Sequence, residues 1–438
     1  MPIRCRPFTA PLTAALLAAI AIAVAVGAVP AAGALDSRPL ALRGGRIMTV
    51  TRGILEDGII LIRDGRIAAV GPAVTIPNDA EVIDIPGFVV FPGFFDATTN
   101  IGTTDPEASE RDDDEATSPL TPHLDILDSL NPGNRYIPEA RRFGVVYALS
   151  APGRGNLLAG SSALIRLRGD DARSMALKTP AAVHGNLGEG PKLRYGAKNV
   201  YPSTRMGQAA LLRQTLIETQ EYIAAREAYE RKAAAWTEKE SRGEKQEGDK
   251  PEPPSPNARL DALVPALKKE IPLVLTANRM DDILTALRIA DEFNLRIILN
   301  EGAEAPKLKD KLAARGIPVL LRPRAAYKLT PETEGAGFEG AAQLVRAGIR
   351  IAFQTGTIQN LGDLIPQAQQ AIAHGLREDD ALRALTLWPA EIFGVADRIG
   401  SIVKGKAADL VVFDRNPLRS PARVKLVVIG GEIVDRED

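Results

Sequence analysis

The sequence contains few of the residues that build cross-links and metal-based reactive sites. Among its 438 residues there is one cysteine, Cys5, and there are three histidines. A single cysteine excludes an intrachain disulfide and a metal site made of thiolates. The histidines are His123, His184 and His374. So small a number disfavours a hydrolytic metal centre, because such centres commonly use two or three converging imidazoles.

An excess of charge of one sign is also missing, and aromatic side chains are scarce. The chain has 54 Lys and Arg against 55 Asp and Glu, a net charge of −1. A nucleic-acid-binding protein normally has a basic excess, so no nucleic-acid partner is expected. Aromatic residues make up 5% of the chain, which disfavours stacking platforms for bases or sugars. The length allows two or three average domains, or one large barrel with an accessory domain.

Residues 1–34 have the pattern of a secretory signal peptide. Arg4 and Arg6 precede an apolar run from Leu12 to Val29, and the small residues Ala32–Ala34 follow as an A-x-A cleavage site. We expect cleavage there, a periplasmic or secreted protein, and no membrane association afterwards. The alternative is that the apolar run remains as an uncleaved anchor, since it is long enough to do so.

The two ends of the remaining chain, residues 35–91 and 398–438, resemble each other in pattern. In the first, strand-like segments flank Asp64-Gly65, and in the second they flank Gly430-Gly431. Both dipeptides suit two-residue hairpin turns, which need positive φ at both positions. We therefore predict a small β-sandwich domain built from both termini.

Residues 92–397 alternate between strand and helix patterns. Four strand candidates between residues 272 and 353 are separated by helical segments, which indicates parallel βαβ units. The number of repeats and the length predict an α/β fold, a (β/α)8 TIM-type barrel. Residues 208–258 are predicted to be an insertion, a long helix followed by a charged, solvated linker.

Three blocks of sequence carry a family resemblance. Pro92–Gly102 is similar to a PGxxDxHxHxG motif, Ala384–Ala390 to ALTxNPA, and Arg398–Val412 to a closing GSIxxGKxADLVV motif. Together they resemble the amidohydrolase superfamily, most closely its imidazolonepropionase-like and prolidase-like branch. The resemblance implies a barrel whose C-terminal mouth holds one or two divalent metals, such as zinc. The metal activates water to hydrolyse carbon–nitrogen bonds of cyclic amides or dipeptide-like substrates.

Other residue types stand where the resemblance places the metal ligands. In chain order these positions hold Thr98, Asn100, His184, Thr276, Glu301 and Gly356. Hydroxyl and amide oxygens bind first-row metals weakly compared with imidazole. Gly356 replaces the aspartate that would act as the general base. We therefore expect no metal cofactor, and a divalent metal such as zinc if one binds at all.

The polar residues left at the barrel mouth are expected to form a ligand pocket, since ligands of TIM barrels bind there. The candidates are Asn100, Thr276, Asn278, Arg279 and Glu301. Arg279 could clamp a carboxylate or could pair with Asp281 or Asp282 nearby. Glu301 is a weak catalytic candidate, because it would need a water and an electrophile beside it.

Three functions remain open from the sequence. The leading one is a secreted, catalytically impaired amidohydrolase homologue that binds a small amide or peptide-like ligand, or supports a catalytic paralogue or a second copy of itself. The second is an active hydrolase of carbon–nitrogen bonds with an atypical metal centre, which the acidic residues between Asp105 and Glu115 would help to form. The third is a purely structural interaction protein.

Overall fold

The structure is a computed structural model that describes residues 38–107, 110–245, 248–324 and 330–437. The predicted signal peptide, with Cys5, lies outside the described residues. Within those ranges, none of the helices has the length and apolar character needed to cross a membrane.

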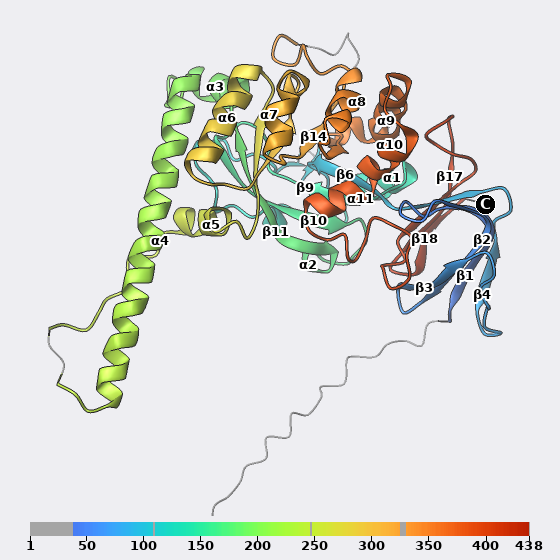
Figure 1. Ribbon diagram of the computed structural model, residues 1–438, viewed down its shortest axis with the longest axis horizontal. Coiled ribbons are helices and arrows are strands. Elements are labelled where there is room, and N and C mark those ends of the chain that lie inside the picture. Colours follow the sequence, from blue (N-terminus) through green and yellow to red (C-terminus); the bar gives the residue numbers. More distant parts are fainter. Residues whose placement is uncertain (1–37, 108–109, 246–247, 325–329, 438) are drawn as a thin grey trace, which may run out of the picture. The chain divides into compact units, whose positions relative to one another are not determined.

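Strands from both ends of the chain form one sheet (Figure 1). Its strands are β1 (Leu40–Met48), β2 (Ile54–Arg63), β3 (Arg66–Gly71), β4 (Glu81–Asp84), β5 (Val89–Pro92), β16 (Leu410–Phe413), β17 (Val424–Ile429) and β18 (Glu432–Arg436). The order is β18-β17-β16-β5-β1-β2-β3, with β4 also paired to β1. The two ends join where β5 pairs with β16. Leu42, Ile60, Val412 and Val428, from both halves of the sheet, share one core.

The predicted β-rich domain built from both termini is therefore confirmed, although its strands form one continuous sheet and not the two separate sheets of a sandwich. Both predicted hairpins are present. Asp64 and Gly65 have φ values of 51° and 71°, and Gly430 and Gly431 have φ values of 62° and 81°. These are the positive angles that two-residue turns demand.

A second sheet of eight strands forms the predicted TIM-type barrel (Figure 1). In sheet order from the end these are β6 (Phe94–Thr99), β9 (Val145–Ser150), β10 (Leu158–Arg166), β11 (Ala176–Asn186), β12 (Leu273–Ala277), β13 (Ile297–Glu301), β14 (Val319–Leu321) and β15 (Ile351–Phe353). The last strand meets the first just beyond its end. There the Gly356 amide donates to the Thr98 carbonyl at 2.9 Å, and the Thr355 amide donates to the buried Asp96 carboxylate at 2.9 Å.

One strand departs from the expected all-parallel arrangement. β10 runs antiparallel to both β9 and β11. A parallel neighbour needs a crossover connection of a dozen or more residues, usually with a helix. The link from β9 to β10 is the short loop Ala151–Leu157, and the link from β10 to β11 holds only the one-turn helix α2 (Ala172–Met175). Both connections are too short to lead back to the other end of the barrel, so β10 runs in the opposite direction to its neighbours.

Helices follow most other strands. They are α1 (Tyr136–Arg142), α3 (Glu189–Gly196), α4 (Arg205–Ser241), α5 (Ala258–Leu267), α6 (Met280–Glu292), α7 (Lys309–Ala314), α8 (Glu339–Arg346), α9 (Leu364–Ala373), α10 (Glu378–Leu385) and α11 (Leu387–Ile392). Short 3-10 helices lie at Ile126–Ser129, Ala305–Leu308 and Ile358–Asp363, and Thr104–Asp105 pairs with Glu110–Arg111 as a small ribbon of strands β7 and β8.

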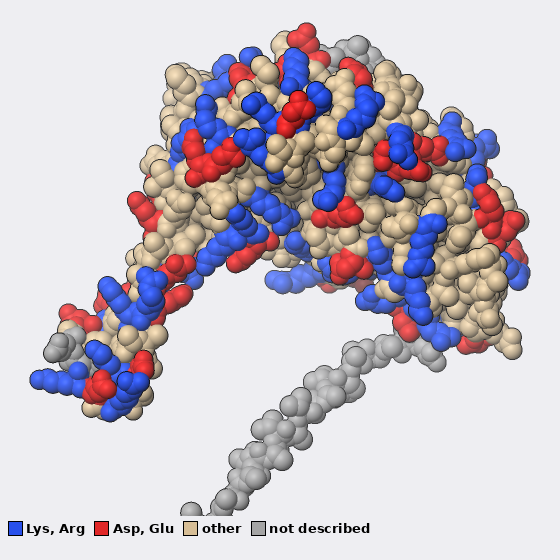
Figure 2. Space-filling model, in the orientation of Figure 1, with Lys and Arg blue, Asp and Glu red and all other residues tan. Residues whose placement is uncertain are grey.

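The predicted insertion contains the long helix α4. Its first half buries Leu212, Leu216 and Thr219, whereas the residues beyond Glu221 are exposed or half-buried. Figure 2 shows charges of both signs interspersed on this second half and over the rest of the visible face. A helix that is polar on most sides is typical of a solvated segment, which fits the charged pattern of the sequence.

The barrel and the terminal sheet share a buried joint. Phe413 of β16 packs on Phe91 and Phe94, with ring centroids 5.7 Å apart in each pair. Beside it, Asp409 of the closing motif accepts a hydrogen bond from the Tyr147 hydroxyl and pairs with Arg166 at 3.0 Å. The closing motif thus fixes the sheet to the floor of the barrel.

Phe413→Ala should reduce the free energy of unfolding by about 3–5 kcal/mol, because it empties a fully buried ring site. Phe143→Ala is the matched control, since the Phe143 side chain is partly exposed, and it should give a much smaller loss. Urea unfolding followed by circular dichroism measures both changes. Equal losses in the two variants would show that the joint does not contribute as described.

Candidate functional site

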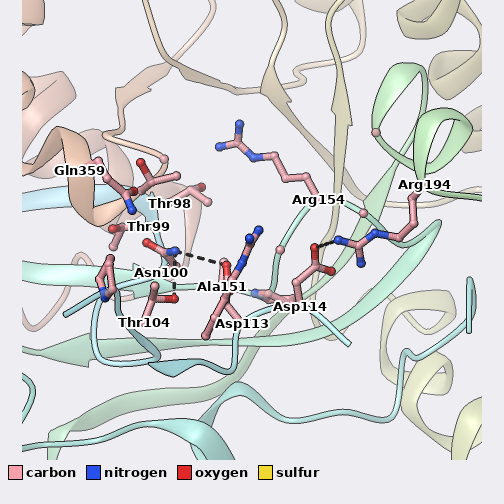
Figure 3. Close-up of a pocket in the computed structure, with 18 residues that line it drawn as sticks. Thr98, Thr99, Asn100, Thr104, Asp113, Asp114, Ala151, Arg154, Arg194 and Gln359 are labelled. Atoms are coloured by element: carbon pink, nitrogen blue, oxygen red, sulfur yellow. Dashed lines mark hydrogen bonds and ion pairs between the residues drawn. The ribbon is translucent and has the colours of Figure 1, made fainter. Parts of the chain in front are cut away.

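A cavity opens at the C-terminal mouth of the barrel, where the loops after β6 and β9 meet the loop after β15 (Figure 3). Its volume is about 660 Å³. Polar side chains supply much of its lining, namely Thr98, Thr99, Asn100, Thr104, Arg111, Asp113, Asp114, Arg154, Arg194, Thr357 and Gln359. A cavity of this size at this end of a barrel suits a small-molecule ligand.

Behind this cavity, the buried carboxylate of Glu301 at the end of β13 is surrounded by three guanidinium groups. Arg154 donates a hydrogen bond to its Oε1, Arg324 donates to the same atom at 3.0 Å, and Arg322 Nη1 lies 3.6 Å away. Asn278 Nδ2 donates to the other oxygen at 2.7 Å. Burial alone would raise the pKa of Glu301, but the fields of Arg154 and Arg324 outweigh it and lower the pKa to about 2.

The sequence analysis did not select these three arginines. Arg154 lies in the loop after β9, and Arg322 and Arg324 follow β14 directly. The sequence could have identified these arginines by their position alone, because residues just after the strands of a barrel lie at its C-terminal mouth. The family motifs place no ligand there, so a comparison restricted to those motifs passes over them.

Gly356, at the position of the family's strand-eight aspartate, is part of the same arrangement. It has a φ of 75°, and a Cβ added there would lie 2.8 Å from Arg154 Nη2 and 3.0 Å from Arg322 Nη1. A larger side chain would therefore push the end of Arg154 aside and crowd Arg322. The two guanidinium groups lie in the space that a side chain at this position would fill.

Two of the predicted pocket residues lie in a hydrogen-bonded layer beside Glu301, and neither lines the cavity. Asn300 Nδ2 donates to Thr276 Oγ1 at 2.9 Å, and Gln354 Nε2 donates to Asn300 Oδ1 at 2.6 Å. Asn278, besides its bond to Glu301, accepts from the Ala303 amide at 3.2 Å. The role of Thr276 and Asn278 in this structure is to orient other polar groups.

Thr98, at one of the family's ligand positions, and Asn100, one of the predicted pocket residues, both line the cavity. The Asn100 side chain makes three hydrogen bonds. Its Nδ2 donates to Thr104 and to Asp113, and its Oδ1 accepts from the Ile358 amide at 2.9 Å. Asp113 belongs to the acidic segment of the sequence. In the described part of the chain no three His, Cys, Asp or Glu side chains are grouped so that they could hold a metal ion.

His184 is buried in β11, at the position of the family's strand-four lysine. Its Nε2 has no hydrogen-bond partner among the described residues. Burial, together with the nearby charge of Arg154, lowers its pKa to about 3, so the imidazole is neutral at physiological pH.

Arg279 does not reach the cavity. Its Nε lies 3.1 Å from Asp281 Oδ1, and about half of its side chain is exposed. Of the two readings that the sequence left open for Arg279, a carboxylate clamp or a local ion pair, the structure has the ion pair with Asp281. The reason is local, because Arg279 precedes α6 directly and Asp281 lies in the first turn of that helix.

Glu301→Gln should reduce the free energy of unfolding by about 3 kcal/mol at pH 7, since each unit of pKa shift corresponds to about 1.4 kcal/mol. A carboxylate whose pKa is lowered on folding stabilises the protein above its ordinary pKa. That stabilisation is lost as the pH falls from 4.5 towards 2. The gap between the wild type and the variant should therefore narrow in acid.

Urea unfolding at several pH values measures this gap. Glu292→Gln removes an exposed pair with Arg213 and is the control, with an expected loss much smaller than that of Glu301→Gln. A Glu301→Gln deficit of the same size at pH 7 and below pH 3 would contradict the charge network.

Comparison with known proteins agrees with this fold. A model of the amidohydrolase family matches residues 283–434. The crystal structure of an amidohydrolase from Thermotoga maritima MSB8 is 32% identical, covers 91% of this chain and all of its own, and has a TM-score of 0.83. An adenosine deaminase from Xanthomonas campestris with bound zinc is 17% identical and covers 90% of this chain and 92% of its own. Its TM-score of 0.51 shows a shared fold alone.

Amidohydrolase tasK from Hapsidospora irregularis is 24% identical over 396 residues, or 86% of this chain. The chain spans only 39% of the length of that relative. The sequence motifs, the barrel joined to a sheet from both termini, and the extended similarity to the Thermotoga protein lead to one assignment: this chain belongs to the amidohydrolase superfamily.

Proposed function

We propose that the barrel mouth is a metal-independent binding site for a small amide or peptide-like ligand. Membership of the superfamily implies hydrolytic activity, and the superfamily is generally metal-dependent. In this proposal the chain keeps the scaffold and the ligand site but has lost metal-assisted hydrolysis. The observation that carries it is the pair of guanidinium groups, from Arg154 and Arg322, beside Gly356.

The residues at the family's ligand positions do not fit a divalent cation. A hydrolytic site needs about three strong protein ligands. Glu301 is already shared by three arginines, and Asn100 Oδ1, a weak metal ligand, already accepts a hydrogen bond from the Ile358 amide. Among the residues at these positions, His184 Nε2 is the one strong donor atom left free.

Electrostatic repulsion by the arginines around Glu301 also disfavours a divalent cation at this site. Two unit charges about 4 Å apart interact with roughly 4 kcal/mol at an effective dielectric constant of ~20, and a dication doubles that figure. A cation near Glu301 would meet this repulsion from each neighbouring arginine. Glu301, with a pKa of about 2, is also a weak base, so it is a poor substitute for the missing aspartate.

We further propose that residues 1–34 direct export, so that the protein acts in the periplasm or outside the cell. This rests on the charged, apolar and small-residue order of that segment. A catalytic paralogue or a second copy of the chain is the proposed partner, because the scaffold is retained around an altered centre.

The second candidate function is metal-assisted hydrolysis of carbon–nitrogen bonds through an atypical centre. It is favoured by the 32% identity to the Thermotoga amidohydrolase over nearly the whole chain. In that case His184 would have to be a ligand, and the arginines would have to move away from Glu301.

Metal content separates the two candidates. Freshly purified protein should contain much less than one equivalent of metal by mass spectrometry. Its melting temperature should also not rise with added Zn²⁺ or Mn²⁺, whereas a metal at about 100 times its Kd would stabilise the fold by about 2.7 kcal/mol. Stoichiometric metal that His184→Ala removes, together with hydrolysis of N-acyl amino acids or dipeptides, would overturn the proposal. Adventitious surface binding would survive that substitution.

A further inference from the structure

We propose that the cavity selects ligands that carry an oxyanion, a carboxylate or a phosphoryl group, and that Arg154 and Arg194 bind it. This inference rests on the proposed metal-independent ligand site and deepens it by naming the chemical class of the ligand. Three observations support it. Positive charges outnumber negative ones behind the cavity, the buried Arg194 Nη1 has no hydrogen-bond partner among the described residues, and glycines lie where the two guanidinium groups pack.

The charges behind the cavity do not cancel. Arg154, Arg322 and Arg324 share the single carboxylate of Glu301, which leaves two positive charges in excess among the described residues. The buried Asp96 carboxylate also acts on Arg322 through its field. If its negative charge is included in the count, one positive charge is still in excess. Burial and the neighbouring Arg154 lower the pKa of Arg322 to about 10, as expected where like charges are crowded together.

Arg154 is the member of this cluster that faces the ligand. It lines the cavity, whereas neither Arg322 nor Arg324 does. At the rim, Arg111 is matched by Asp113 and Arg194 by Asp114. Arg154, although it is also paired with Glu301, is therefore the arginine through which the net positive charge of the cluster reaches the cavity.

Arg194 offers a second donor from the side of α3 (Figure 3). One end of its guanidinium group pairs with Asp114, while Nη1 is buried without a hydrogen-bond partner among the described residues. Buried polar groups without partners are uncommon in folded proteins, and a bound ligand is one way of satisfying them. An anion that accepted from Arg194 Nη1 would satisfy this one.

Glycine makes room for both guanidinium groups. A Cβ added at Gly155 would lie 1.9 Å from Arg194 Cζ, and one added at Gly356 would lie 2.8 Å from Arg154 Nη2. At both places the guanidinium group therefore packs against a backbone position that has no side chain. Guanidinium groups bind carboxylates and phosphates through paired hydrogen bonds, which makes these two anion types the expected ligands.

Isothermal titration calorimetry at constant ionic strength tests the inference. The probes are N-acetylglycine, its neutral counterpart N-acetylglycinamide, and inorganic phosphate. We expect at least one anion to bind about tenfold or more tightly than the neutral amide, a difference of about 1.4 kcal/mol. The tighter of the two anions identifies carboxylate or phosphoryl as the preferred group.

Arg154→Gln should weaken binding of that anion about tenfold or more, and should weaken any binding of the neutral amide by a smaller factor. Arg279→Gln is the matched control, because Arg279 is an exposed arginine away from the cavity, and it should bind like the wild type. If circular dichroism shows that Arg154→Gln is unfolded, Arg194→Gln replaces it in the same titration, with the same expected loss.

Two results would overturn the inference: anions that bind no better than the amide, or anion binding that neither cavity variant weakens. A neutral amide that binds while the anions do not would refute the anion site and leave the metal-independent site standing. Stoichiometric metal that His184→Ala removes, together with hydrolytic activity, would instead refute the proposed function itself, so the two failures are distinguishable.

Discussion

The barrel mouth depends on one buried carboxylate that three guanidinium groups share. Glu301 is reached by Arg154 from the loop after β9 and by Arg322 and Arg324 from the segment after β14. Removing one partner of such a buried charge network leaves uncompensated charge and is strongly destabilising. The network therefore ties the end of β13 to the segments that follow β9 and β14, and it also sets the sign of the electric field that a ligand meets.

Much of the fold could be predicted from the sequence because its signals are local. Asp64-Gly65 and Gly430-Gly431 specify two-residue turns, and the alternation between residues 272 and 353 specifies β12 to β15. The direction of β10 depends instead on how far its connections can reach. The seven residues between β9 and β10 rule out a parallel return, a length argument that the sequence would have allowed.

The site was less accessible to prediction from the sequence, for a physical reason. Motif comparison indicates which residues occupy the family's positions, and three of these, Thr98, Asn100 and Gly356, line the cavity. It gives no information about cavity residues that lie outside the family motifs, such as Arg154 in the loop after β9. The sequence also left two readings open for Arg279, and only the structure shows that it pairs with the carboxylate two residues away.

The pairing of β5 with β16 has a consequence for how the chain is made. Val90 pairs with Val412, so the N-terminal strands cannot complete their sheet until β16 has been synthesised. Contacts so distant in sequence form late and slow folding. Until β16 is in place, the edge of β5 is open to pairing with a strand of another molecule.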